Sequence, residues 1–177
     1  MRVTSKSSRP TDSRWTLIRP PHAVAALHDW VPDDYVPQSR PSAALIEATA
    51  TALREVEDLA VELGLPYRAI TIYFAVHLPD EIGKYINGTG STGPAILIDG
   101  PKLMRASREL RVSLYDAVLS TVVHELGHAS IDAAGIELGY DVEEPIVEDF
   151  TQAFVRHGAP DWAARDLMRD ASEAATS

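Results

Sequence analysis

The chain has 177 residues, 45% of them hydrophobic, which is enough for one globular domain with a substantial core. It contains no cysteine, so disulfides, cysteine-based zinc sites and thiol nucleophiles are excluded. A formal net charge of -10 opposes binding to phosphate backbones, and nucleic acid is therefore not an expected partner.

The first 22 residues differ in composition from the rest of the chain. They are rich in Ser, Thr, Arg and Pro, which predicts a flexible N-terminal arm over residues 1–22. Residues 23–177 are expected to form a single domain whose last few residues are loose. No stretch approaches the roughly 18 uninterrupted apolar residues of a membrane span, and the N-terminus lacks the apolar region of a secretory signal. We expect a cytoplasmic protein without membrane contacts.

Two helices are predicted in the first third of the domain. Residues 22–31 have the composition of a short helix. From Ser42 onward, apolar residues recur at three- and four-residue steps as far as Gly64, which predicts a longer scaffold helix.

Strands are predicted in the middle of the chain. Residues 68–76 are dense in β-branched and aromatic side chains, which is typical of a buried strand. A short strand is possible at 85–87, and residues 95–99 form the clearest second strand. The glycine-rich stretch 88–93 leads into a strand and not into a helix, so it predicts a loop and not a phosphate site.

A long helix is predicted to begin at Ser113, which forms a capping pair with Asp116. It can run to about Ala134, where Gly135 ends it. Inside it lies the stretch His-Glu-Leu-Gly-His at 124–128, an H-E-x-x-H pattern.

The spacing of this motif has a direct chemical meaning. His124 and His128 are one helical turn apart and project from the same face, so that two imidazoles can bind one ion. Glu125 lies about a third of a turn away from His124, where it can act as a general base without being a ligand.

A catalytic zinc ion uses three protein ligands and leaves one position open. The third ligand is expected on a downstream helix that starts at Pro145, because proline is tolerated in the first turn of a helix. Glu148 is the preferred ligand, with Gln152 one turn later as its hydrogen-bond partner. Glu144 is the alternative, and the neighbouring acids Glu143 and Asp149 are expected to face solvent.

The motif resembles a known group of enzymes, the H-E-x-x-H zinc metallopeptidases of the gluzincin kind. Residues 121–129 are similar to the active-site helix of compact ImmA/IrrE-type and phage-encoded peptidase-like proteins, and residues 148–154 are similar to their ligand helix. The metzincin pattern does not fit, because it places Gly and His where this chain has Ile131 and Ala134. The resemblance implies a zincin-like α+β domain, mainly helical, with a short sheet of about two to four strands on the motif helix.

These features predict a zinc-dependent peptidase that binds Zn²⁺ through His124, His128 and Glu148, with Glu125 as general base. Its partner would be a peptide or protein substrate, and residues 95–99 are the candidate strand edge for binding it. Tyr140 and Tyr73 are candidates to stabilise the oxyanion. Two alternatives stay open: a non-catalytic regulatory or binding module stabilised by zinc, and a metal-free interaction protein with a coincidental motif.

Overall fold

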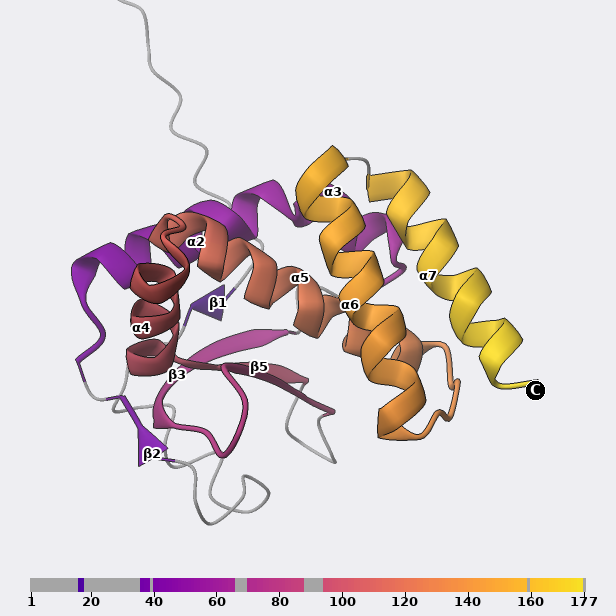
Figure 1. Cartoon of the computed structure of the whole chain (residues 1–177), viewed down its shortest axis with the longest axis horizontal. Helices are drawn as coiled ribbons and strands as arrows, with labels where there is room; N and C mark the ends of the chain where they lie inside the picture. The colour runs from indigo at the N-terminus through magenta and orange to yellow at the C-terminus, as the bar shows by residue number, and fades with distance from the viewer. Residues whose placement is uncertain are drawn as a thin grey trace, which may run out of the picture.

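The structure is a computed structural model that describes residues 16–17, 36–38, 40–65, 70–87, 94–158 and 160–176. Its described part is an α+β arrangement, mainly helical, with a small sheet (Figure 1). In chain order the elements are β1 (Thr16–Leu17), β2 (Val36–Pro37), α2 (Ala43–Glu55), α3 (Glu57–Glu62), β3 (Thr71–His77), β4 (Gly83–Ile86), β5 (Ala95–Asp99), α4 (Gly100–Leu110), α5 (Leu114–Ala133), α6 (Tyr140–His157) and α7 (Pro160–Ala174).

The sheet is built around β3 and β5, which run parallel to each other. The strand order is β1-β3-β5-β4, with β2 pairing on β3 and β4 antiparallel to β5. Strand β5 therefore lies inside the sheet with all five residues buried. The prediction that residues 95–99 offer an exposed strand edge is wrong, because β4 covers that edge of β5.

Side chains alternate between the two faces of the sheet along β3 and β5, so that each face is covered by its own hydrophobic cluster. Ile72 and Phe74 of β3 and Ile96 and Ile98 of β5 belong to the main hydrophobic core under the helices. Residues between them point to the opposite face, where Tyr73, Ala75 and Leu97 form a second, smaller cluster.

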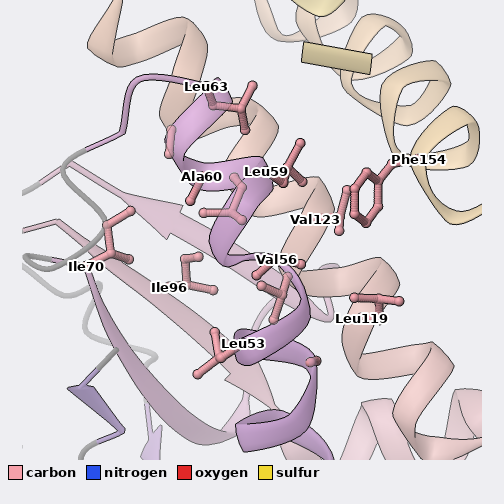
Figure 2. Close-up of a cluster of buried hydrophobic side chains, with 14 of the residues drawn as sticks. Leu53, Val56, Leu59, Ala60, Leu63, Ile70, Ile96, Leu119, Val123 and Phe154 are labelled. Atoms are coloured by element: carbon pink, nitrogen blue, oxygen red, sulfur yellow. The ribbon is translucent and has the colours of Figure 1, made fainter. Parts of the chain in front are cut away.

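The predicted scaffold helix is present in two pieces. Ser42 caps α2 by accepting a hydrogen bond from the Leu45 backbone N–H, and α3 follows after a break at Val56. The buried face of α2 and α3 packs against strand and α5 side chains in the main core, which Figure 2 shows around Leu53, Leu59 and Val123.

Helix α5, which carries the H-E-x-x-H motif, crosses the sheet beside α2, and α6 and α7 pack at the end where α5 finishes (Figure 1). Its predicted ends are confirmed: the Ser113 side chain accepts a hydrogen bond from the Asp116 N–H, and the helix stops at Ala133. Gly135 follows with φ of +68°, a conformation that glycine adopts without strain.

The predicted start of the downstream helix at Pro145 is wrong. Helix α6 begins at Tyr140, and its first turn is closed by a 3.0 Å hydrogen bond from the Glu143 N–H to the Gly139 carbonyl. Pro145 lies inside the helix, where its nitrogen cannot donate the hydrogen bond that other helical residues make. The earlier start adds Glu143 and Glu144 to the helix that carries Glu148.

Two described helices were not predicted. Asp99 caps α4 through the Lys102 N–H, and α7 buries small side chains and Leu167 against α3 and α6. Residues Thr16–Leu17 of the predicted arm pair with β3, whereas the rest of that arm, the predicted helix at 22–31 and the loop at 88–93 lie outside the described residues. None of the described helices is long and apolar enough to span a membrane.

Candidate metal centre

The motif histidines open into a cleft of about 750 Å³ between β4, α5 and α6. The β3–β4 loop and the α5–α6 connection complete its lining. His124 and His128 are largely buried, with 18% and 17% of their side chains exposed, so the two rings are held at the floor of a site that solvent reaches.

Three side chains in this cleft could hold a metal ion: His124, His128 and Glu144. The two Nε2 atoms lie 3.2 Å apart, as the one-turn spacing in α5 predicts. Glu144 presents one carboxylate oxygen to each ring, at 3.2 Å from His124 Nε2 and 3.3 Å from His128 Nε2. We call these three side chains the metal group.

The other ring nitrogens face two more carboxylates of α6. Glu143 Oε1 lies 2.6 Å from His128 Nδ1, which is hydrogen-bond distance. Glu148 Oε2 lies 3.7 Å from His124 Nδ1, beyond a direct hydrogen bond. A carboxylate bonded at Nδ1 favours the proton on that nitrogen and leaves Nε2 free to bind a metal; Glu143 makes this contact with His128, whereas Glu148 can act on His124 only through its charge.

One ligand atom from each of the three residues lies within 4.8 Å of the other two, which is close enough for them to share one metal ion. Zinc bonded to nitrogen and oxygen at about 2.0–2.1 Å in a tetrahedron places neighbouring ligand atoms about 3.3–3.4 Å apart. In the metal group the two Nε2 atoms are 3.2 Å apart, and the distances of 3.2 and 3.3 Å to Glu144 are made by its two different carboxylate oxygens. Two imidazoles and one carboxylate are also a ligand set that zinc binds in proteins.

Comparisons with protein-family models, curated proteins and solved structures found no match for this chain. The assignment of a possible metal site therefore rests on the motif and on the geometry of the residues around it.

Glycine inside the motif explains how α6 comes so close to α5. A Cβ atom built on Gly127 would lie 2.9 Å from Val147 Cγ1 and 3.2 Å from Phe150 Cδ1. Val147 and Phe150 are buried residues of α6, so the missing side chain of Gly127 lets the two helices pack tightly. This close packing carries Glu143 and Glu144 to the histidines.

Glu125 projects toward the opposite side of the cleft, where β4 lies. Its carboxylate is only 5% exposed and accepts a 2.6 Å hydrogen bond from the Tyr85 backbone N–H. Hydrogen-bonded pairs alternate along the antiparallel β4–β5 ladder, and the Asp99 N–H donates to the Ile82 carbonyl. Tyr85 therefore lies at a position whose N–H points away from β5. Gly83 provides the space, because a Cβ there would lie 2.5 Å from Glu125 Oε1.

Burial also sets the protonation of these groups. It is the main cause that raises the pKa of Glu125 to about 8; the carboxylates of Glu81 and Glu144 act in the same direction, while the hydrogen bond from Tyr85 acts against it. Burial lowers the pKa of His124, as does the positive charge of His128, while Glu144 and Glu148 oppose the shift. A lowered pKa keeps His124 neutral, the state that binds metal.

A second contact ties β4 to α5. The Tyr85 hydroxyl donates to Asp132 Oδ2 and the Asn87 amide donates to Asp132 Oδ1, both at 3.1 Å. Asp132 lies one turn beyond His128 on the same helix, so β4 is fastened along the side of α5 that carries the motif.

The structure places the predicted site residues close together but changes the third member of the group. His124 and His128 meet as predicted, whereas Glu144, the alternative third ligand, takes the place beside Nε2 that was expected for Glu148. Because α6 starts at Tyr140, Glu144 is a helical residue one turn before Glu148. Gln152 does bond Glu148, at 2.8 Å.

Of the other predictions near the site, some agree with the structure and one is wrong. Asp149 is exposed as expected, but the prediction that Glu143 faces solvent is wrong, since it bonds His128. Tyr140 lines the cleft, whereas Tyr73 is buried in the second cluster across the sheet. Asp132 and Gly83 were not predicted to matter, and Asp132 carried a usable signal: it is eight residues after His124 and therefore on the same helical face.

Proposed function

We propose that this protein is a zinc-dependent peptidase in which His124, His128 and Glu144 hold Zn²⁺ and Glu125 is the general base. The observation that carries the proposal is the convergence of both Nε2 atoms on Glu144 within 3.3 Å, while each Nδ1 atom faces a separate carboxylate. Histidines that served only to pack α5 against α6 would not need this arrangement on both nitrogens.

When bound at the metal group, Zn²⁺ would supply a Lewis acid that polarises a carbonyl group and lowers the pKa of water. Glu125 then removes a proton from the attacking water as its oxygen forms a bond to the amide carbon. The carbon–nitrogen bond breaks, and Glu125 returns the proton to the leaving amine. Its raised pKa, about 8, suits a group that must both accept and return a proton near neutral pH.

The remaining residues of the cleft support this chemistry. The Tyr85 N–H and the gap at Gly83 hold the Glu125 carboxylate at the β4 side, separate from the carboxylates of α6. A substrate polypeptide would lie in the cleft between β4 and α6. Tyr140, which is 64% exposed and lines the cleft at the start of α6, can donate a hydrogen bond to the developing oxyanion.

The test compares wild type with Glu125→Gln. Both proteins are expected to bind about one zinc ion per chain in metal analysis, because Glu125 is outside the ligand set. Only wild type should hydrolyse a mixed library of quenched fluorescent peptides, with a loss of about 10² to 10⁴ in the variant. A double variant, His124→Ala with His128→Ala, should lose both zinc and hydrolysis.

The same experiment separates the alternatives. Zinc binding without hydrolysis by wild type, together with an unchanged biological effect of Glu125→Gln, would favour a non-catalytic module. Wild type that binds no zinc, and whose melting temperature does not respond to a chelator, would overturn the metal centre itself.

A further inference from the structure

The cleft around the metal group has a strong excess of negative charge. Its lining contains one lysine, Lys84, against eight carboxylates, which are Asp80, Glu81, Glu125, Asp132, Glu137, Glu143, Glu144 and Glu148. The chain as a whole is less one-sided, with 16 Lys and Arg against 26 Asp and Glu. The imbalance at this cleft therefore needs an explanation beyond overall composition.

Part of this charge belongs to the metal group. A divalent ion beside two neutral imidazoles would offset two of the three glutamates that α6 presents to the histidines. Glu81 and Lys84 form an ion pair at 3.2 Å and cancel each other. Glu125 is buried and engaged by the Tyr85 N–H, so it is not offered to a charged ligand.

Three carboxylates are left without a compensating charge among the described residues. Asp132 accepts hydrogen bonds from Tyr85 and Asn87, which are neutral groups, so neither of these described partners offsets its charge. Asp80 and Glu137 have no hydrogen bond or ion pair within the described part of the chain, and both are exposed. They project from the β3–β4 loop and the α5–α6 connection, on two different sides of the metal group.

We propose that the cleft selects cationic polypeptide segments, in which Lys or Arg side chains pair with Asp80, Asp132 and Glu137 on either side of the metal group. This inference rests on the proposed function and names its substrate class. An acidic or neutral segment entering the same cleft would meet uncompensated negative charge at both ends of β4, because Asp80 precedes this strand and Asp132 bonds the residues at its end.

The test measures binding separately from turnover. The zinc-loaded Glu125→Gln variant of the full chain is titrated with three fluorescent peptides of equal length that differ only in having Lys, Gln or Glu at every second position. The Lys peptide is expected to bind about tenfold more tightly than the Glu peptide at low ionic strength, and the difference should shrink as salt is added.

Substitutions then locate the effect. Asp80→Asn and Glu137→Gln should each weaken binding of the Lys peptide by about two- to fivefold and leave the Gln peptide unaffected. Asparagine is suitable at position 80 because this residue has φ of 53°, which Asn tolerates. Glu47→Gln, at an exposed acid of α2 away from the cleft, is the matched control and should change nothing.

The outcomes distinguish this inference from the proposed function. Equal binding of the Lys and Glu peptides, or no binding of the Lys peptide, would overturn the inference. If wild type hydrolyses all three peptides with equal kcat/KM, the function stands and the charge selection fails. If the Lys peptide binds selectively but zinc-loaded wild type does not cleave it, the selection stands and the peptidase function fails.

Discussion

The two walls of the cleft contact the same helix, α5, in different ways. The α6 wall, formed by Glu143, Glu144 and Glu148, meets the histidines of α5 through side chains only. The β4 wall, formed by residues 83–87, meets Glu125 through a backbone N–H and is tied to Asp132 by side chains.

This difference separates metal binding from positioning of the base. A substitution in the α6 wall should change metal affinity, whereas one in the β4 wall should change Glu125 while the metal is retained. Two residues of α5 follow this division: Gly127, inside the motif, packs against α6, and Thr121, one turn before Glu125, lies against Gly83. The predictions below test this separation in order of expected size.

The largest effect concerns Glu125 in the metal-free protein. Folding raises its pKa from 4.5 to about 8, so the folded state binds more protons than the unfolded state between these values. Stability is therefore greatest at the acid end of that window and falls as the pH rises through it, by at most on the order of 5 kcal/mol. Urea unfolding of the chelator-treated protein from pH 5 to pH 8 measures this fall.

Glu125→Gln is the control for this prediction. The lowered pKa of His124 acts in the opposite direction, since it makes stability rise with pH up to its ordinary value of 6.5. Because His124 is present in both proteins, the difference between their pH profiles isolates Glu125. Identical profiles would show that Glu125 does not titrate as a buried group.

The second prediction compares two glutamates of the α6 wall. Glu144→Gln removes the charged member of the metal group and should lower zinc affinity by more than about 100-fold. Glu148→Gln is the matched substitution at a residue that lies 3.7 Å from His124 Nδ1, and it should lower affinity by about tenfold or less. Competition with a zinc-binding dye measures both constants, and a reversed order would restore Glu148 as the third ligand.

The third prediction concerns Glu143, whose carboxylate bonds His128 Nδ1 at 2.6 Å. Glu143→Gln keeps the size and the hydrogen bond but removes the negative charge beside Nδ1 that makes Nε2 a stronger metal ligand. Zinc affinity should fall by about 10- to 100-fold. Asp149→Asn, at an exposed acid on the same helix, should have no effect.

The smallest effects are expected from a pair of glycine substitutions, one for each wall. Gly127→Ala places a Cβ 2.9 Å from Val147, so it should push α6 away and weaken zinc binding. Its cost in stability is reduced by the higher helix propensity of alanine, about 1 kcal/mol. Gly83→Ala places a Cβ 2.5 Å from Glu125 Oε1, so it should reduce hydrolysis while zinc affinity is retained.

A double-mutant cycle checks the second member of this pair. In a Glu125→Ala background the contact with Oε1 no longer exists, and the cost of Gly83→Ala should shrink from about 1–2 kcal/mol to the part caused by Thr121. Additive costs in thermal unfolding would mean that Gly83 does not provide the space for Glu125.

Local signals explain what could be predicted. The bounds of α5 follow from local signals in one helix, namely the Ser113 cap, the apolar stripe and Gly135, and the strand β5 follows from the apolar run 95–98. The α4 and α7 helices were missed because α4 begins directly at the end of a strand and α7 buries mostly alanines, which give a weak apolar pattern. Pro145 was predicted to start the downstream helix, but the first turn of α6 is already closed before the chain reaches this proline.

The sequence alone determined that His124 and His128 share a helical face with Glu125 beside them, because a spacing of four residues in an α-helix has only one geometry. Only the tertiary structure decided which glutamate meets them and which strand borders the cleft. Those choices depend on how closely α6 packs on Gly127 and on where β4 pairs in the sheet. Both are contacts between segments far apart in the chain, which no local pattern encodes.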